Sequence, residues 1–331
     1  MSRESFTTPD GCRLAYDIGG KGPAVLWQHG LGAPFDQPLA VFPDAAVTRI
    51  TLACRGHEDS DLGPLGDLSI ATFARDALAL LDHLGIAAVT AGGISLGAGI
   101  ALRLAAYHPD RVDRLILARP AWIDRPAMAG QGGYVEAGRA LELYGATEGL
   151  ARFRASALFQ GVEAASPDNA KSLLGYFARP RSETTTALLA RLPKDWPGVP
   201  ASMIEGLGQP TLVIGNGEDV VHPLDHARAL AELIPAARLA VIPSKSVDPD
   251  SHTKAFRAAL AQFLDAAAQH NIVGLKNHPA VGGLRISLYN GVPVEDVLHL
   301  RDFMEDFAQA AVSLRGKISR PQCFPTRSPQ T

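Results

Sequence analysis

The chain has 331 residues, of which 47% are hydrophobic and 20% charged, a composition typical of folded globular proteins and unlike that of disordered ones. Its 31 basic and 34 acidic residues leave a net charge of −3, which predicts neither a nucleic-acid nor a membrane partner. Three scattered cysteines exclude a disulfide framework and a zinc knuckle. At roughly 150 residues per domain, the length predicts about two units.

Short apolar runs alternate with helical patterns through the first 270 residues. This alternation predicts βαβ units and an α/β fold with a mostly parallel sheet. Extended runs on both sides of Pro9-Asp10-Gly11 predict an amino-terminal hairpin. The expected strands are Ala24–Trp27, Thr48–Ala53, Ala88–Ala91, Arg114–Ala118, Thr211–Gly215 and Arg238–Ile242. The helices expected between them include Ile70–Leu84, Leu96–Tyr107 and Asp225–Leu233.

The alternation stops between residues 121 and 207, where helical periodicity is interrupted by Pro and Gly. This predicts a helical cap at 121–207, inserted into a core formed by 1–120 and 208–269. An insertion after a sheet strand would lie over the crevice where open α/β sheets bind their ligands.

From residue 270 onward the pattern changes again. A strand-like run, Leu284–Tyr289, precedes a helix that begins at Pro293 and carries an apolar stripe. We expect a small α/β appendage over 270–312, and the stripe predicts contact with the core, a partner or another copy in a homo-oligomer. Residues 313–331 contain four basic residues and no acid, which predicts a disordered basic tail.

Neither a leader nor a membrane span is expected. No apolar run follows Met1, so we predict a cytoplasmic protein. The stretch 85–106 is strongly apolar, but its glycines, Ser95 and Arg103 argue against a span.

The run Gly93-Ile94-Ser95-Leu96-Gly97 fits the pattern G-x-S-x-G between an expected strand and an expected helix. Where a strand turns directly into a helix and projects a serine, there is no room for a side chain two positions before or two positions after that serine. The helix N-terminus then directs N–H groups to where an oxyanion would form. We predict Ser95 as a nucleophile; a tight turn with an incidental serine is the alternative.

A serine nucleophile needs a base oriented by a carboxylate, and sites of this strand–turn–helix type follow the chain order serine, acid, histidine. Asp219 lies in the loop after the expected strand Thr211–Gly215 and is the predicted acid. The neighbouring Glu218 is the alternative.

The predicted base is His252, in the loop after Arg238–Ile242 and before the last core helix, expected at Thr253–Leu264. Its position in the chain order favours this role over that of an ordinary surface histidine. Asp248 and Asp250 in the same loop are further alternatives for the acid.

An oxyanion hole needs two N–H donors. One is expected from Leu96, the residue after the nucleophile. The other is expected from Leu31 or Gly32, in the loop that follows Ala24–Trp27. His29 in this loop is interpreted as a residue that orients the backbone.

Neither a metal nor a cofactor is predicted. His222 and His226 have a spacing that can bind metal on a helix, but Pro223 and the lack of a third ligand favour the start of a surface helix. The glycines around Ser95 do not form G-x-G-x-x-G after a strand, so a dinucleotide site is not expected.

Residues 1 to about 268 resemble the α/β-hydrolase superfamily. The matching features are the His29-Gly30 turn, the run Arg55–Asp61 where many members show G-H-G-x-S, the elbow at Ser95, and the placements of Asp219 and His252. The resemblance implies an α/β-hydrolase fold with those last three residues as nucleophile, acid and base. Glu58 and the run 246–252 depart from the family pattern. Serine at the elbow disfavours the related dehalogenases and epoxide hydrolases, which use aspartate there.

Residues 272 to about 310 resemble the carboxyl-terminal end of phosphoserine aminotransferase. The matching runs are 274–278 and 281–290. In that family the arginine at the position of Arg285 holds the substrate carboxylate, and the histidine at the position of His278 helps to bind the phosphate. Pro279 stands where an arginine is usual, and nothing upstream resembles a pyridoxal-phosphate domain.

These features predict a serine hydrolase that forms an acyl-enzyme on Ser95 with a small, largely apolar ester, lactone or thioester as its small-molecule substrate. A C–C bond hydrolase or a cofactor-free perhydrolase would use the same triad. A non-catalytic, hydrolase-like binding scaffold and a remnant of an aminotransferase are the remaining alternatives.

Overall fold

A computed structural model describes residues 2–126, 128–270, 276–277 and 284–285. The chain divides into two compact units, Met1–Asn271 and Ile272–Thr331. In the second unit, β9 (Lys276–Asn277) and β10 (Leu284–Arg285) pair as antiparallel strands. His278, the helix expected from Pro293, the oligomer contact predicted for it and the basic tail lie outside the described residues.

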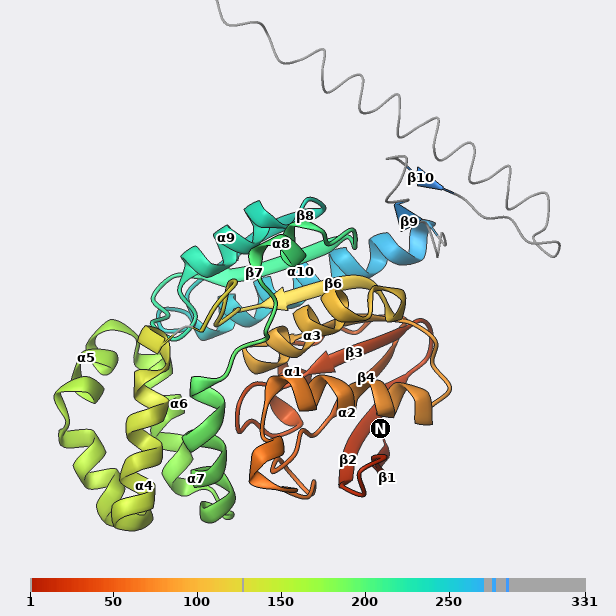
Figure 1. The fold of residues 1–331 in the computed structure, drawn as a ribbon. Helices are drawn as coiled ribbons and strands as arrows, with labels where there is room; N and C mark the ends of the chain where they lie inside the picture. The colour runs from red at the N-terminus through yellow and green to blue at the C-terminus, as the bar shows by residue number, and fades with distance from the viewer. Residues whose placement is uncertain (1, 127, 271–275, 278–283, 286–331) are drawn as a thin grey trace, which may run out of the picture. The chain divides into compact units, whose positions relative to one another are not determined.

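The first unit contains an eight-stranded sheet with the order β1-β2-β4-β3-β5-β6-β7-β8 (Figure 1). The pairs β1–β2 and β2–β4 are antiparallel, and all the other neighbours are parallel. The strands are β1 Ser2–Thr7, β2 Arg13–Gly20, β3 Ala24–Gln28, β4 Thr48–Leu52, β5 Val89–Ile94, β6 Val112–Ala118, β7 Thr211–Asn216 and β8 Ala237–Ile242. The predicted mostly parallel α/β sheet and its amino-terminal hairpin are confirmed.

Helices cover both faces of this sheet because neighbouring side chains of a strand point to opposite sides. In β3, Leu26 belongs to the apolar cluster that includes α2 and α3, whereas Val25 and Trp27 pack with α10. The Trp27 ring meets Phe256 of α10 edge-on, with centroids 6.3 Å apart. The helices are α1 Asp36–Val41, α2 Ile70–His83, α3 Leu96–Tyr107, α9 Leu224–Leu233 and α10 Pro249–His270.

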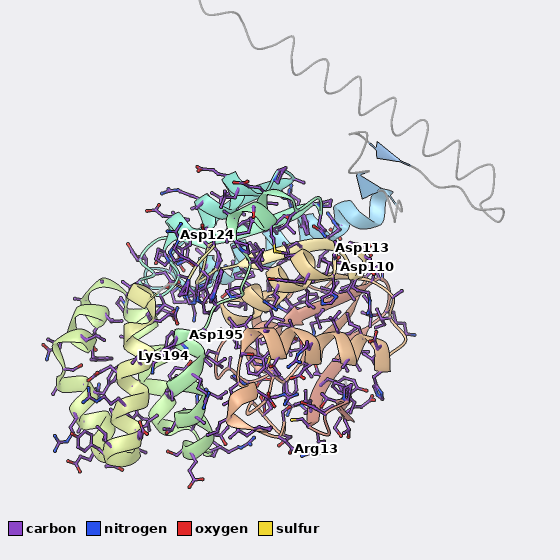
Figure 2. All side chains as sticks on the ribbon, viewed as in Figure 1. Arg13, Asp110, Asp113, Asp124, Lys194 and Asp195 are labelled. Atoms are coloured by element: carbon purple, nitrogen blue, oxygen red, sulfur yellow. The ribbon has the colours of Figure 1, made fainter. Side chains whose placement is uncertain are left out.

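The start of α2 shows how side chains satisfy the free N–H groups of a helix end. The Ser69 hydroxyl accepts the Thr72 N–H at 3.1 Å, and Asp195 accepts the Ile70 N–H at 2.6 Å. Asp195 lies near the end of the inserted segment, before its last helix, and is labelled in Figure 2. This contact therefore ties the end of the insertion to the sheet-covering layer.

Five helices lie between β6 and β7: α4 Met128–Ala155, α5 Ala157–Ala165, α6 Pro167–Gly175, α7 Ser182–Arg191 and α8 Ala201–Glu205. The helix α4 is interrupted at Gly145, whose φ of +69° leaves the right-handed helical region. Aromatic side chains such as Tyr134, Phe153 and Phe177 give these helices an apolar cluster of their own. Figure 1 shows α4 to α7 on the side of the sheet toward which the arrows of β3 and β6 point. Short 3-10 helices occur at Leu65–Asp67, Pro109–Arg111, Tyr176–Ala178 and Leu192–Lys194.

The apolar stretch 85–106 is divided between β5 and α3, which are part of the core. Among the residues that the structure describes, no helix combines the length and the apolar character that crossing a membrane requires.

Candidate active site

Ser95 lies at the sharp turn between β5 and α3. Its φ of +57° and ψ of −109° are unusual for a residue with a side chain, so the surrounding packing must hold this conformation. The turn is tight because a Cβ on Gly93 would lie 2.7 Å from the Gln28 carbonyl oxygen, and one on Gly97 would lie 2.4 Å from it. The two glycines let the helix start against β3, which leaves the Ser95 hydroxyl projecting into a cavity.

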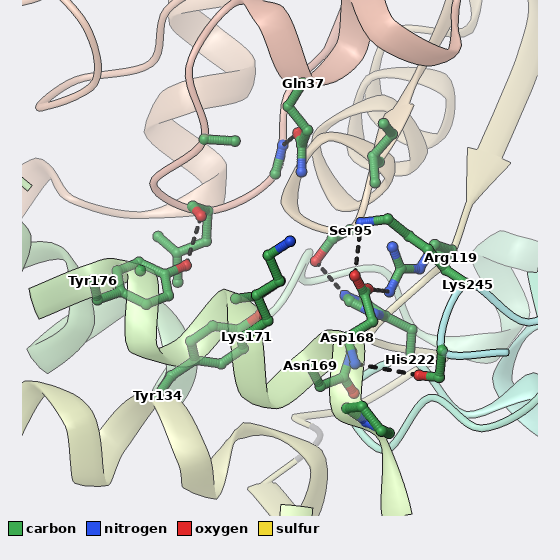
Figure 3. A pocket seen from close by; sticks show the side chains of 18 of the residues that line it. Gln37, Ser95, Arg119, Tyr134, Asp168, Asn169, Lys171, Tyr176, His222 and Lys245 are labelled. Atoms are coloured by element: carbon green, nitrogen blue, oxygen red, sulfur yellow. Dashed lines mark hydrogen bonds and ion pairs between the residues drawn. The ribbon is translucent and has the colours of Figure 1, made fainter. Parts of the chain in front are cut away.

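His222 is the hydrogen-bond partner of Ser95, with 2.8 Å between His222 Nε2 and Ser95 Oγ (Figure 3). His222 Nδ1 lies 3.0 and 3.1 Å from the two carboxylate oxygens of Asp219. A carboxylate accepts only, so Nδ1 carries the proton and the lone pair of Nε2 faces the serine hydroxyl. Serine, histidine and aspartate thus form one continuous chain of hydrogen bonds.

Asp219 is held in its ionised form. Its side chain is 1% exposed, and burial opposes ionisation, but His222 and Arg119 outweigh burial and keep the pKa of this carboxyl far below its usual value. The neighbouring Glu218, the alternative acid, is exposed and has a φ of +54°. A left-handed turn at Glu218 therefore directs Asp219, and not Glu218, into the interior.

His252, the base expected from the sequence, makes its hydrogen bonds elsewhere. Its Nδ1 lies 2.9 Å from the Pro243 carbonyl oxygen, and its ring packs against Phe256 with centroids 5.9 Å apart. The side chain is buried, and burial lowers its pKa. The structure therefore places His222, and not His252, against Ser95 and Asp219.

The physical reason is the start of α10. This helix begins at Pro249 and not at Thr253, with Asp248 accepting the Ser251 N–H at 2.9 Å, as an N-cap residue does. His252 consequently lies in the first turn of the helix and faces the core. Asp248 and Asp250 are exposed, so neither lies beside the serine. An Asp-Pro pair is a typical N-cap and N1 combination, and this signal could have indicated the earlier start.

His222 was expected at the start of a surface helix, and this expectation is corrected: the residue is 7% exposed and precedes α9. The signal in the sequence is its spacing from Asp219. The two residues are three positions apart in one tight turn, where Asp219 Oδ1 also accepts the His222 main-chain N–H at 2.9 Å. The position of His222 is therefore explained by Asp219 and does not require a metal shared with His226. The described residues contain no group of three or more His, Cys, Asp or Glu arranged for a metal.

The predicted oxyanion hole needs two backbone N–H donors, from Leu96 and from the loop after β3. Leu96 is the first residue of α3, so its N–H has no carbonyl acceptor one turn earlier in that helix. Of the two candidates in the other loop, Gly32 donates its N–H to His57 Nε2 at 2.7 Å. Leu31 makes no such bond through its N–H within the described chain, so its N–H is the candidate of the two that has no acceptor there.

The loop 29–35 is held by neutral histidines and by Glu58. The rings of His29 and His57 pack against each other at a tilt of 43°, with centroids 4.5 Å apart. Burial lowers the pKa of His29 to about 4 and that of His57 well below its usual value. Each can then accept an N–H at Nε2, from Cys54 and Gly32 respectively. Glu58 accepts the Phe35 N–H at 2.8 Å.

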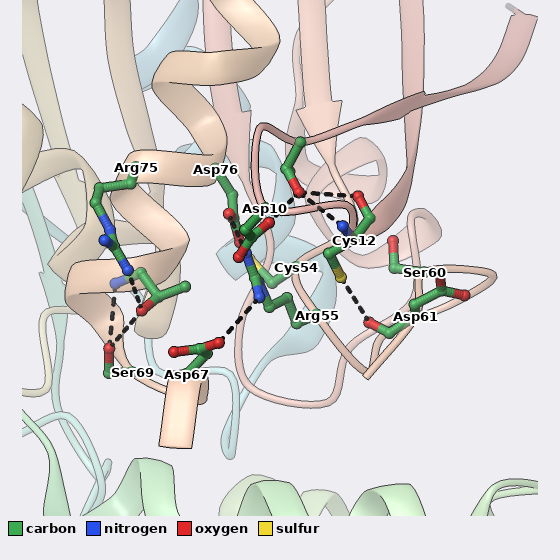
Figure 4. A network of polar contacts seen from close by, with 12 residues as sticks. Asp10, Cys12, Cys54, Arg55, Ser60, Asp61, Asp67, Ser69, Arg75 and Asp76 are labelled. Carbon is green, nitrogen blue, oxygen red and sulfur yellow. Dashed lines mark hydrogen bonds and ion pairs between the residues drawn. The ribbon is translucent and has the colours of Figure 1, made fainter. Parts of the chain in front are cut away.

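Arg55 anchors the turn that carries His57 and Glu58. Its guanidinium is 1% exposed and bonds to both oxygens of Asp76 at 2.8 Å and to Asp10 at 2.6 Å (Figure 4). These bonds fasten the turn to α2 and to the β1–β2 hairpin. The support of the loop 29–35 therefore extends through the core to Arg55.

The cavity in front of Ser95 has a volume of about 590 Å³. Its walls come from the loop after β3, the elbow, α4, α6 and the loops after β6, β7 and β8. Its lining includes five charged side chains: Arg119, Asp168, Lys171, Arg179 and Lys245. This charged lining contrasts with the small, largely apolar substrate expected from the sequence.

The family model described as alpha/beta hydrolase fold matches residues 23–245. Over 281 residues, the chain is 27% identical to an uncharacterized protein of Mycobacterium tuberculosis, covering 78% of each protein. It is also 34% identical over 119 residues to phosphoserine aminotransferase of Acinetobacter baumannii, covering 34% of this chain and 33% of that protein. The chain therefore spans about a third of the aminotransferase.

Solved structures share the fold. The enol-lactonase from Burkholderia xenovorans has a TM-score of 0.60 and 21% identity, covering 79% of this chain and 100% of that one. The esterase from Exiguobacterium antarcticum has a TM-score of 0.62 and 19% identity, covering 80% of this chain and 100% of that one. The meta-cleavage product hydrolase from Pseudomonas fluorescens has a TM-score of 0.61 and 20% identity, covering 80% of this chain and 98% of that one. At these identities the likeness extends to the fold and not to a particular substrate.

Proposed function

The chain belongs to the α/β-hydrolase fold family and is a hydrolase, and from this premise we propose that it is a serine hydrolase that cleaves an ester, lactone or thioester through an acyl-enzyme on Ser95. In the proposal His222 is the general base and Asp219 orients it, so His222 takes the role expected of His252. Leu31 and Leu96 supply the oxyanion hole.

Acylation begins when Ser95 Oγ attacks the substrate carbonyl carbon and its proton passes to His222 Nε2. The 2.8 Å separation is within the range required for such a transfer. Asp219, kept ionised, stabilises the imidazolium that forms and holds the ring in the tautomer that presents Nε2.

The carbonyl oxygen becomes an oxyanion in the tetrahedral intermediate, and the N–H groups of Leu31 and Leu96 donate to it. Collapse of this intermediate breaks the bond to the leaving group, which receives the proton from His222. A water molecule then gives its proton to His222 and attacks the acyl carbon. The second collapse releases the acid and returns the proton to Ser95 Oγ.

The observation that carries the proposal is the bonded chain from Ser95 Oγ through both nitrogens of His222 to Asp219. We expect Ser95→Ala to abolish hydrolysis of short p-nitrophenyl esters while the circular-dichroism spectrum and melting temperature stay those of the parent. Full-rate hydrolysis by the folded variant would refute the acyl-enzyme.

The assignment of the base is tested by a matched pair, His222→Gln and His252→Gln. We expect kcat to fall by about 10³-fold or more in His222→Gln, because the nucleophile loses its base. His252→Gln should retain most of kcat and lower the melting temperature, since His252 is a buried side chain bonded to Pro243. The reverse pattern would restore His252 as the base.

A fluorophosphonate probe distinguishes the enzyme from a non-catalytic scaffold with the same fold. The probe should label Ser95 in the parent and in His252→Gln, and mass spectrometry should locate the adduct on the peptide that contains Ser95. Folded parent protein that resists labelling would favour the scaffold.

A further inference from the structure

The cavity in front of Ser95 has an excess of positive charge. Four basic side chains line it, Arg119, Lys171, Arg179 and Lys245, and Asp168 is the acidic side chain in the lining. Asp219 does not line the cavity but bonds to Arg119, and so contributes a second carboxylate. Without counting His222, four cations against two carboxylates leave two positive charges in excess.

The carboxylates neutralise one side of the cavity. Arg119 Nη2 lies 2.6 Å from Asp219 and 3.4 Å from Asp168, and Lys245 Nζ lies 2.7 Å from Asp168. Arg119 and Lys245 therefore share both available carboxylates. Figure 3 shows the contacts of Arg119 and Lys245 with Asp168 beside His222.

The two remaining cations lie on the side of the oxyanion-binding loop. Arg179 stacks on Tyr176, with its guanidinium carbon 4.0 Å from the ring centroid. A Cβ on Gly32 would meet Arg179 Nη1 at 1.6 Å, so the guanidinium lies directly against the loop that contains Leu31. Lys171 extends from α6 into the space between Tyr176 and Ser95 (Figure 3).

Neither Lys171 nor Arg179 forms an ion pair with a carboxylate within the described part of the chain. A cation that has no protein counter-charge in a recessed site attracts an anionic ligand, because the cavity walls exclude part of the screening water. The planar guanidinium of Arg179, held flat by Tyr176, is suited to receive two oxygens of one oxyanion.

We propose that the substrate carries an anionic group, a carboxylate or another oxyanion, which Arg179 and Lys171 bind while the scissile carbonyl lies at Ser95. The inference rests on the proposed acyl-enzyme function and adds the class of substrate. It revises the expectation of a largely apolar substrate, because an apolar ligand would leave both cations without a partner.

Two esters that differ only at the far end of the acyl chain test the inference. In p-nitrophenyl adipate the chain ends in a carboxylate, and in p-nitrophenyl hexanoate it ends in a methyl group. We expect kcat/KM for the adipate to exceed that for the hexanoate by about 10-fold or more, as for a hydrogen bond to a charged group. The preference should decrease as salt is added.

The preference should depend on the two cations. Arg179→Leu and Lys171→Met should each lower the adipate-to-hexanoate ratio of kcat/KM, by about 10-fold for Arg179→Leu, and Arg179→Lys should retain part of it. Arg191→Leu is the matched control, because Arg191 is exposed on α7 and does not line the cavity. Each ratio is measured within one variant, so a general loss of activity cancels.

An equal or greater kcat/KM for the hexanoate in the parent, or an unchanged ratio in Arg179→Leu, would overturn the inference and leave the serine mechanism intact. Failure of the mechanism gives a different result: Ser95→Ala would then hydrolyse both esters like the parent. Succinate and inorganic phosphate, compared as competitive inhibitors, distinguish a carboxylate-binding site from a phosphate-binding one. The inhibition should be lost in Arg179→Leu.

Discussion

Arg119 and Asp219 form a buried ion pair in which one carboxylate oxygen accepts both contacts. Arg119 Nε and Nη2 lie 2.8 and 2.6 Å from Asp219 Oδ2. The other oxygen, Oδ1, accepts the His222 main-chain N–H at 2.9 Å. Arg119 therefore fixes the carboxylate that orients His222, and it keeps its charge because Asp219 and Asp168 raise its pKa against the effect of burial.

Arg119→Met should destabilise the protein by about 3–5 kcal/mol, since it leaves the buried carboxylate of Asp219 without its cation. Urea unfolding monitored by fluorescence measures the free energy of unfolding. Arg191→Met, which removes an exposed arginine of α7, should change it by less than about 0.5 kcal/mol. Equal losses in the two variants would contradict the role of the ion pair.

Tyr176→Phe should lower kcat by about fivefold with little change in fold stability. Tyr176 Oη donates a 2.6 Å hydrogen bond to the Leu31 carbonyl, and this bond holds the peptide next to the proposed oxyanion donor. Tyr134→Phe is the control, because Tyr134 packs edge-on against Tyr176 with centroids 5.6 Å apart but makes no bond to Leu31 in the described structure. Steady-state kinetics with one ester compares the two, and a larger loss of kcat in Tyr134→Phe would refute the positioning role.

Gly97→Ala should prevent folding or lower the melting temperature sharply. The added methyl group would lie 2.4 Å from the Gln28 carbonyl oxygen, a backbone atom of β3 that cannot move independently of the sheet. In α5, Gly161→Ala meets nothing within 4 Å and should stabilise the protein by about 0.5–1 kcal/mol. Differential scanning calorimetry of both variants tests the contrast. A Gly97→Ala protein as stable as the parent would contradict the packing at the elbow.

Stability should decrease as the pH falls from about 6.5 to about 4. The folded state lowers the pKa of His29 from 6.5 to about 4, chiefly by burial, so between these values the unfolded chain binds the proton and the folded chain does not. Unfolding is therefore favoured by acid, by on the order of 3 kcal/mol for His29 over this range. His57, also lowered by burial, adds in the same direction.

Urea unfolding at several pH values measures this slope, and His29→Gln should flatten it. A variant with the parent slope would show that His29 is not the group that titrates. Acid inactivation of the enzyme is measured separately, because it depends on the catalytic groups and not on the stability of the fold.

Much of the fold could be predicted because its signals are local. A strand such as Val89–Ile94 and the helix Leu96–Tyr107 each show their own apolar pattern, and the glycines at 93 and 97 are required by backbone contacts within the turn. Ser95 and Asp219 each follow a recognisable strand. Their positions in the chain therefore carried enough information to nominate them.

The partner of Ser95 could not be identified in the same way. His222 and His252 both lie after Asp219 in the chain, and the choice between them depends on where α10 begins and on which ring faces the serine. Ser95 and His222 are 127 positions apart, and their 2.8 Å contact exists only because two loops meet at one end of the sheet. Chain order alone does not contain that distance.

By itself the sequence determined the α/β class and the elbow around Ser95 and nominated Asp219 as the acid, because short-range backbone sterics and hydrophobic periodicity act along the chain. Only the tertiary structure decided that His222 contacts Ser95 and that the cavity is charged. These cations come from three segments far apart in the chain, one with Arg119, one with Lys171 and Arg179, and one with Lys245, in a protein whose net charge is only −3. Charges act through distance in space, and folding alone brings these four together.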